Sequence, residues 1–305
     1  MKRLVTRSDF DGLACAMMLK ELKLIDEIKF VHPKDVQDGK IELTKEDITT
    51  NLPFDPRVGL AFDHHLSETE RLCTGLCENL IIDETARSAA AVVYKYYGGA
   101  KTFTTISPEL MSAVDKGDSA DFTVDEILNP TGWVLLHFIM DARTGLGRFH
   151  DFRISNYDLM MELIDYCRFH TADEILALPD VKERVDLYFA QQDEFIAQVK
   201  RVHRKEGRIL IIDLRKEDVI YAGNRFLVYA MYPDVQISVH IAWGVQKQNT
   251  AVMIGKSILN QTSQINIGDV CLAYGGGGHH NAGTCQLEND KVESLLPEII
   301  HRLSK

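Results

Sequence analysis

The sequence lacks any apolar run long enough to cross a membrane. Segments such as residues 134–140 fall far short of the roughly 20 apolar residues that a spanning helix needs. The first residues reach the charged Asp9 too early to contain the apolar core of a secretion signal. We therefore expect a cytoplasmic protein with no membrane partner.

Cysteine is scarce, and its spacing does not suit a metal site. No two cysteines are separated by two residues, and the closest pair is separated by three. In a cytoplasmic chain of this size, free buried thiols fit better than disulfides or a zinc site. We assign no functional role to the six cysteines, which are Cys15, Cys73, Cys77, Cys167, Cys271 and Cys285.

Positive charge is in deficit, because 34 lysines and arginines face 45 aspartates and glutamates, for a net charge of −11. Proteins that hold duplex DNA usually present a basic face, since neutralised phosphates supply much of their affinity. The acidic balance disfavours duplex DNA and favours a small phosphorylated substrate. Metal ions held by carboxylates would reverse the local sign where such an anion binds.

The length and composition of the chain suffice for two globular domains. It has 305 residues, of which 45% are hydrophobic and 26% charged. In the first half, strand-like segments alternate with helical ones, which predicts an α/β domain with a mostly parallel sheet. Its expected strands are residues 3–6, 28–32, 59–62 and 80–82, and its expected helices are residues 13–24, residues 88–97 and one that begins at Ser107.

A long charged helix is predicted from Asp180 to about Lys205, roughly 40 Å at ~1.5 Å per residue. We place the domain boundary in it, with residues 1–190 in one domain, residues 191–305 in a smaller one, and residues 180–206 as the connecting helix. The second domain is expected to be a mixed-sheet α/β domain. Its predicted elements are a strand at 209–214, a hairpin of 226–232 and 235–243, a strand at 250–254 and a closing helix at 292–303.

Asp9 and Asp11 follow the first predicted strand, at the edge where open α/β sheets bind ligands. Two carboxylates separated by one residue can turn toward one point, and Gly12 permits a tight turn into a helix whose N-terminus favours anions. Asp-x-Asp-Gly is also common in solvated turns, so this pair alone does not identify a site.

Asp63, His64 and His65 also end a predicted strand. A carboxylate next to imidazoles suits Mn²⁺, Fe²⁺ or Co²⁺ better than Mg²⁺ alone. The alternative is a surface turn with coincidental histidines. That alternative is weakened because two such clusters end strands of the same predicted sheet.

Four consecutive glycines, residues 275–278, precede His279 and His280. Glycine runs are conformationally costly and offer no side chain to pack. Apolar residues 270–274, which the pattern assigns to a strand, run directly into them and argue against a flexible linker. We expect backbone N–H groups here to approach an anionic ligand, which makes Gly276, Gly277, Gly278, His279 and His280 the predicted substrate-binding residues.

Together these motifs resemble, over nearly the whole chain, the DHH phosphoesterase family with its DHH-associated C-terminal domain. The family includes exopolyphosphatases, oligoribonucleases and cyclic dinucleotide phosphodiesterases. The resemblance implies a catalytic first domain, a substrate-binding second domain, and a hydrolase of phosphoester or phosphoanhydride bonds. It implies Mn²⁺, with Mg²⁺ or Co²⁺ as alternatives, in the two-metal arrangement for in-line displacement. The implied substrates are a short single-stranded oligonucleotide, a nucleotide bisphosphate, a cyclic dinucleotide or polyphosphate. Dimers are common in the family, so a homodimer is compatible with the resemblance.

The resemblance also carries over individual residues. His65 would contact the phosphoryl group, and it forms the catalytic triplet with Asp63 and His64. For the metal ligand on the helix that begins at Ser107, the resemblance favours Asp115 over Asp118. The implied metal ligands are Asp9, Asp11, Asp63, His64 and Asp115.

Two positions depart from the family pattern. The family usually has a histidine shortly before its first aspartates, where this chain has Arg7, a cation that would repel a metal and attract phosphate. An aspartate expected between residues 41 and 60 is matched in position by Asn51, a weaker neutral ligand, with Asp55 as the alternative. Arg7 and Asn51 are assigned to substrate binding, together with the glycine loop. These departures leave open one ion or two, and a family member that binds a nucleotide or polyphosphate without hydrolysing it.

Residues 141–153 add Arg143, Arg148 and Arg153 among glycines and phenylalanines. Arginine pairs bidentately with phosphate. A phosphate-contacting loop and a solvated connector both fit this segment.

Overall fold

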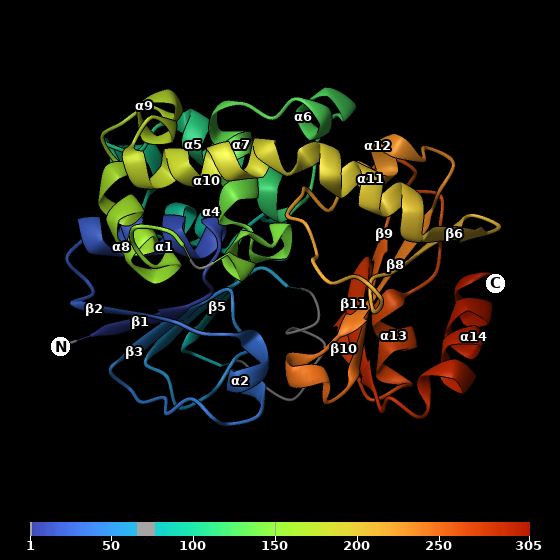
Figure 1. Ribbon diagram of the computed structural model, residues 1–305. Coiled ribbons are helices and arrows are strands. Elements are labelled where there is room, and N and C mark those ends of the chain that lie inside the picture. The colour runs from blue at the N-terminus through green and yellow to red at the C-terminus, as the bar shows by residue number, and fades with distance from the viewer. Residues whose placement is uncertain (1, 66–76, 150) are drawn as a thin grey trace. The chain divides into compact units, whose positions relative to one another are not determined.

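The computed structural model describes residues 2–65, 77–149 and 151–305, which divide into two compact units (Figure 1). The first unit contains the chain up to Phe122 and residues Pro130–Leu187, and the second contains Thr123–Asn129 and Tyr188–Lys305. The chain passes from the first unit to the second near residue 187, and Thr123–Asn129, from within the expected first domain, belong to the second unit. Over the described ranges, no helix is both long and apolar enough to cross a bilayer.

The first unit is built on a five-stranded parallel sheet in the order β2-β1-β3-β4-β5, as the alternating pattern predicts. Its strands are β1 (Arg3–Thr6), β2 (Glu27–Phe30), β3 (Asp47–Thr50), β4 (Leu60–Asp63) and β5 (Leu80–Ile82). The chain moves to opposite sides of β1 to form β2 and β3. The crevice beyond the carboxyl ends of β1 and β3 is therefore the position where sheets of this order bind ligands.

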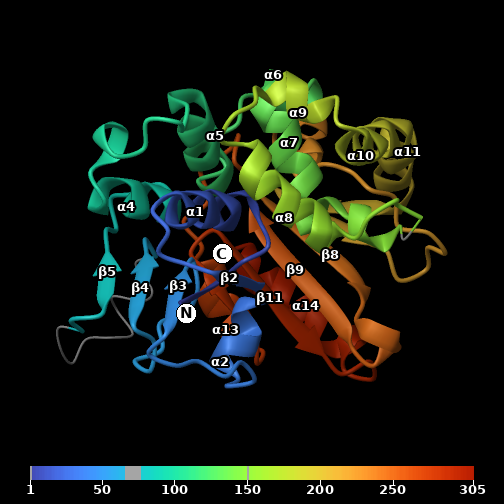
Figure 2. The same ribbon diagram turned by 90° about the vertical axis from the view of Figure 1, so that its left-hand side faces the viewer.

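Helices cover both faces of this sheet (Figure 2). On one face lie α1 (Phe10–Glu21), α4 (Ala89–Tyr96), α5 (Pro108–Asp118), α7 (Gly132–Met140) and α8 (Asn156–Tyr166), whose buried side chains form the larger core. On the other face α2 (Pro33–Gln37) contributes Val36 to a smaller core with Val5 and Ala61. Every residue of α1 from Phe10 to Leu19 is buried, so this helix fixes the loop that precedes it. The short helix α9 (Ala172–Leu176) also belongs to this unit.

The second unit is built on a six-stranded mixed sheet in the order β10-β11-β9-β8-β7-β6. Ile237, Val239 and Ile241 of β8 face the core, and α13 (Ile267–Leu272) and α14 (Val292–Leu303) pack against them. A short helix from the middle of the chain, α6 (Val124–Leu128), packs against α12 (Leu227–Met231), where the Asn224 Nδ2 donates to the Ile127 carbonyl oxygen at 3.3 Å. The strands are β6 (His203–Glu206), β7 (Ile209–Asp213), β8 (Ile237–Trp243), β9 (Thr250–Lys256), β10 (Gly277–His279) and β11 (Ala282–Leu287).

Three elements differ from the sequence-based expectations. The connecting helix consists of α10 (Pro179–Ala190) and α11 (Gln192–Val202), which meet at Gln191, whose Oε1 accepts from the Ala222 N–H at 2.7 Å. Residues 226–232 do not form a strand but contain α12, so β7 and β8 pair in parallel and not as a hairpin. Residues 270–274 are not a strand either, because α13 extends to Leu272. Short apolar runs fit a buried helix and a buried strand equally well.

Candidate functional site

Asp9 lies at the start of α1, where both of its carboxylate oxygens have partners. Its Oδ1 caps the helix by accepting from the Gly12 N–H at 2.9 Å, and its Oδ2 lies 3.0 Å from the Nε of Arg7. A Cβ at Gly12 would lie 2.0 Å from the Arg7 carbonyl oxygen, so the turn requires glycine. Burial raises the pKa of Asp9, and the Arg7 guanidinium opposes that shift.

Asp11 is buried beneath the start of α4. Its two oxygens accept from the backbone N–H groups of Ala89 at 3.1 Å and Ala90 at 2.7 Å. Burial, followed by the carboxylates of Asp118 and Asp9, raises the pKa of Asp11 well above its usual range. A cation placed among these carboxylates would relieve that unfavourable concentration of negative charge.

The predicted triplet lies at the carboxyl end of β4. The Asp63 carboxylate is 2% exposed, and its Oδ1 accepts from the His64 N–H at 2.8 Å and lies 2.7 Å from the His65 Nδ1. The His64 Nε2 lies 3.0 Å from the Asp118 Oδ2. Burial disfavours a charged His64 ring, but the carboxylates of Asp118, Asp11 and Asp63 outweigh burial and raise its pKa to about 9.

These side chains form two ligand sets that share one imidazole. Asp11, His64 and Asp118 form one set and Asp63, His64 and His65 the other, and within each set the ligand atoms lie within 4.8 Å of one another. Carboxylate oxygen and imidazole nitrogen are the donors that divalent Mn, Fe and Co accept. The residues therefore fit a divalent metal at the carboxyl ends of β1 and β4.

The geometry brings Asp118, and not Asp115, to this set. Both residues lie on α5, but the Asp115 Oδ1 accepts from the Ser88 Oγ at 2.6 Å. His64, followed by His65 and Arg7, outweighs the effect of burial and lowers the pKa of Asp118. The metal-ligand role predicted for Asp115 is therefore better suited to Asp118, the alternative that the resemblance ranked lower.

Asn51 follows β3 with a left-handed backbone, φ 54°, and is 2% exposed. Its backbone N–H donates to the Phe62 carbonyl oxygen at 3.1 Å, which fixes it between the ends of β1 and β4. Within the described ranges, neither its Oδ1 nor its Nδ2 has a hydrogen-bond partner. An unpaired buried amide costs about 1–3 kcal/mol, so this side chain fits a site that binds a ligand. Asp55, the alternative, instead pairs with Arg57 at 2.6 Å.

A second arginine also faces the carboxylates. Arg143 lies on a short turn, with its Nε 2.7 Å from the Asp141 Oδ1 and 51% of its side chain exposed. It lines a small cavity together with Asp9, Asp11 and Asp118. Partial desolvation disfavours its charge, but the carboxylates of Asp141, Asp9 and Asp118 raise the pKa of Arg143. This placement of Arg143 is consistent with the interpretation of residues 141–153 as a phosphate-contacting loop, the alternative being a solvated connector.

In the second unit the four glycines begin a hairpin, in which Gly278 of β10 pairs with Gly283 of β11. A Cβ at Gly276 would lie 2.2 Å from the Thr284 carbonyl oxygen, and one at Gly278 would lie 2.3 Å from the Ala282 carbonyl oxygen. At Gly277 a Cβ would meet no atom within 4 Å. The expectation that the glycines have no packing value is therefore wrong for Gly276 and Gly278, whereas Gly277 is open to a ligand.

The predicted His279 and His280 are both exposed on this hairpin. The His280 Nε2 lies 2.8 Å from the Nζ of Lys256, which also donates to the Ser263 carbonyl oxygen at 3.2 Å. Burial lowers the pKa of Lys256. This lysine ends β9 beside the hairpin, and sequence reasoning missed it because it carries no motif of its own.

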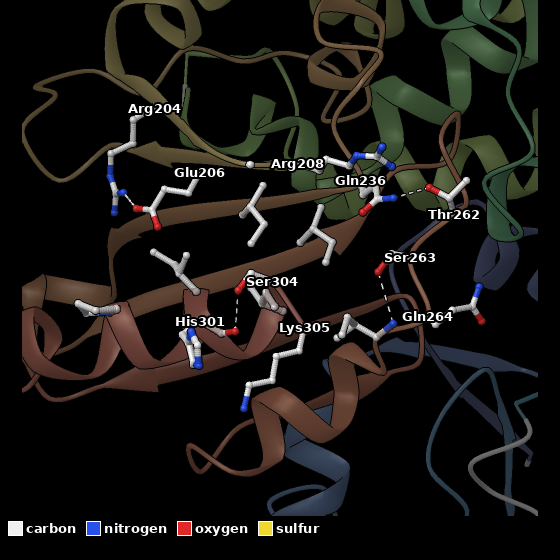
Figure 3. A pocket seen from close by; sticks show the side chains of 17 residues that line it. Arg204, Glu206, Arg208, Gln236, Thr262, Ser263, Gln264, His301, Ser304 and Lys305 are labelled. Carbon is white, nitrogen blue, oxygen red and sulfur yellow. Dashed lines mark hydrogen bonds and ion pairs between the residues drawn. The ribbon is translucent and has the colours of Figure 1, made fainter.

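A separate hollow of about 670 Å³ lies in the second unit (Figure 3). Apolar Ile237 and Ile300 line it together with the exposed Arg208 and Lys305, and an ion pair joins Arg204 to Glu206. None of the predicted site residues is among the described residues that line it. It is therefore not the predicted site.

Two comparisons with known proteins find no match, and a third finds similar solved structures. No family model and no curated protein matches the chain. Among solved structures, the chain is 52% identical to the pGpG-specific phosphodiesterase PggH from Vibrio cholerae, over 100% of this chain and 99% of that one, with a TM-score of 0.81. It is also similar to an exopolyphosphatase-related protein from Bacteroides fragilis, with 10% identity over 100% of this chain and 94% of that one and a TM-score of 0.55, which shows the fold alone.

Proposed function

The chain belongs to the DHH family of phosphoesterases, and on this premise we propose that it hydrolyses the linear dinucleotide pGpG to two molecules of GMP. As a family member it is a metal-dependent hydrolase of phosphoester bonds. The observation that supports this substrate is the 52% identity, over the full length, to a pGpG-specific phosphodiesterase.

The proposed reaction is a single in-line displacement at the phosphorus between the two nucleosides. The oxygen of a water molecule forms a bond to phosphorus, and the bond from phosphorus to the 3′ oxygen breaks. The leaving 3′ oxygen takes a proton, so both products are 5′-monophosphates. A substrate of this size, with a few phosphate charges, also agrees with the acidic balance of the chain.

We assign the metal to Asp11, His64 and Asp118, with Asp63 beside them, and we propose Mn²⁺ as the ion. When bound, it supplies Lewis-acid stabilisation of the charge that develops on the phosphoryl oxygens. The carboxylate of Asp63 has a second role, because its contact with the His65 Nδ1 at 2.7 Å holds that ring in one orientation. His65 can then present its other nitrogen to a phosphoryl oxygen.

Arg7 and Arg143 are the proposed phosphate-binding cations of the first unit. Each has a carboxylate partner, Asp9 at 3.0 Å and Asp141 at 2.7 Å, that limits the orientation of its guanidinium. A guanidinium fixed in this way loses less conformational entropy when it binds a phosphate. The glycine hairpin keeps its predicted role as the substrate-binding element of the second unit.

The test is chromatographic measurement of GMP released from pGpG, with and without Mn²⁺, beside the linear dinucleotide pApA, a cyclic dinucleotide and polyphosphate. We expect metal-dependent GMP release and little turnover of the other compounds. Asp63→Ala should lower kcat by at least about 100-fold, because it removes both a carboxylate and the partner of His65.

Asp165→Ala is the matched control, since Asp165 forms an exposed ion pair with Lys20 at 2.7 Å. It should retain wild-type turnover. Full activity of the Asp63→Ala variant, or phosphate release from polyphosphate without cleavage of pGpG, would contradict the proposed function.

A further inference from the structure

Arg7 engages one of the carboxylates that a second metal ion would need. The Nε of Arg7 lies 3.0 Å from the Asp9 Oδ2, and the other oxygen of Asp9 accepts from the Gly12 N–H at 2.9 Å. Asp9 thus already has a cation and a backbone donor. Asp11 also accepts two backbone N–H groups, but it shares its ligand set with the imidazole of His64 and the carboxylate of Asp118.

Asn51 also disfavours a second ion. It is fixed between the ends of β1 and β4 and is fully buried, yet its side chain is a neutral amide. Two dications close together are normally bridged by a carboxylate, whose charge offsets their repulsion. An amide oxygen can bind one ion but supplies no charge to hold two.

The charge of the ligand set Asp11, His64 and Asp118 is matched by one divalent ion. Asp11 and Asp118 carry the charge that one divalent ion neutralises, and their ligand atoms and that of His64 lie within 4.8 Å of one another. Arg7 and Arg143 both interact electrostatically with Asp9, and Arg7 also with Asp118. A second dication beside Asp9 would meet two permanent cations.

From these contacts we infer that the site holds one divalent cation, on Asp11, His64 and Asp118, and that the Arg7 guanidinium takes the place and the charge of a second ion. The inference rests on the proposed metal-dependent function. It assigns Arg7 to the substrate phosphate as a fixed cation that no chelator removes.

The first experiment uses the full-length protein, stripped of metal with a chelator and then titrated with MnCl₂. Calorimetry and elemental analysis should give one Mn²⁺ per chain, and electron paramagnetic resonance at saturation should show the hyperfine pattern of an isolated ion. Two ions per chain, or the exchange-coupled spectrum of a pair ~4 Å apart, would overturn the inference.

The second experiment uses the double variant Arg7→His and Asn51→Asp. It gives the site the imidazole and the carboxylate that would bind a second ion. We expect it to bind two Mn²⁺ per chain and to give the coupled spectrum. Arg7→Lys, which keeps the positive charge, should bind one, as should the control Arg57→His at an exposed ion pair. A folded double variant that still binds one ion would show that Arg7 and Asn51 do not set the count, and would also overturn the inference.

Turnover of pGpG in the same samples separates the two proposals. One bound ion with GMP release supports both. One bound ion without any hydrolysis refutes the proposed function and leaves the ion count intact, whereas two ions with hydrolysis refutes the ion count alone.

Discussion

His64 depends on its carboxylate neighbours for its charge state. Burial alone would keep its ring neutral, yet the carboxylates of Asp118, Asp11 and Asp63 raise its pKa to about 9. A ring that holds a proton this strongly in the absence of metal occupies a strongly negative environment. Metal binding must displace this proton, so the same carboxylates that hold the proton create the attraction for the ion.

Substitution of Asp118 tests which carboxylate of α5 belongs to this environment. Asp118→Asn should weaken Mn²⁺ binding by roughly 100-fold or more, since a lost ligand should cost at least as much as a lost outer-shell partner. Asp115→Asn, three residues earlier on the same helix, should change the metal affinity by less than about threefold, because Asp115 bonds to Ser88. Isothermal titration with MnCl₂ measures both. The reverse order of effects would restore Asp115 as the ligand.

The sequence alone does not distinguish these two aspartates. Residues three apart on a helix lie near the same face, so the side chains of Asp115 and Asp118 leave α5 in similar directions. The rotation of α5 against β4 decides which one reaches His64, and that rotation is set by core packing. By contrast, Asp11 and His64 were predictable, since each follows a strand of one parallel sheet and the carboxyl ends of such strands meet at one edge.

At the scale of the element, the glycine hairpin combines two different uses of glycine. Gly276 and Gly278 are needed because the two strands of the hairpin approach each other too closely for any side chain. Gly277 lies between them with no atom near its missing side chain. Packing constrains the neighbours, and the residue between them has open space beside it.

A matched pair of substitutions separates these uses. Gly278→Ala should destabilise the fold by about 1–3 kcal/mol, because its Cβ would lie 2.3 Å from the Ala282 carbonyl oxygen. Gly277→Val should leave the melting temperature within a few degrees of the wild-type value and should raise KM for pGpG. Thermal unfolding and steady-state kinetics measure the two effects. If Gly277→Val lowers the melting temperature and leaves KM unchanged, the hairpin is only structural.

The elements that sequence reasoning assigned wrongly are short and apolar. Residues 227–231 and 267–272 are too short to show a helical period, and their buried surroundings remove the polar face that would reveal it. Longer or well-delimited elements were predicted closely: α14 begins and ends where the pattern places it, and β1 coincides with residues 3–6.

At the scale of the whole molecule, one half-buried histidine links stability to pH. His240 lies on β8 between Ile212 of β7 and Met253 of β9. Burial, reinforced by the positive charge of Arg225, lowers its pKa to about 4. In the unfolded chain histidine titrates near pH 6.5. Between about pH 6.5 and pH 4, residue 240 is therefore protonated in the unfolded chain and neutral in the folded chain.

The expected consequence is a loss of stability as the pH falls through this window. Between pH 7.5 and pH 5, His240 should contribute at most about 2 kcal/mol to the decrease in unfolding free energy. Urea denaturation at the two pH values should show a smaller decrease for His240→Gln than for the wild type. His301→Gln, at an exposed position of α14, should behave as the wild type. Equal decreases in all three proteins would exclude His240 as the source.

The membership of α6 in the second unit has a consequence for the order of biosynthesis. Ile127, which is 1% exposed in the finished fold, accepts a hydrogen bond from Asn224, 97 residues further along the chain. A ribosome that adds about 5–20 residues per second needs roughly 5–20 s to cover that interval. The first unit can therefore begin to fold around a nascent segment whose native partner has not yet been translated.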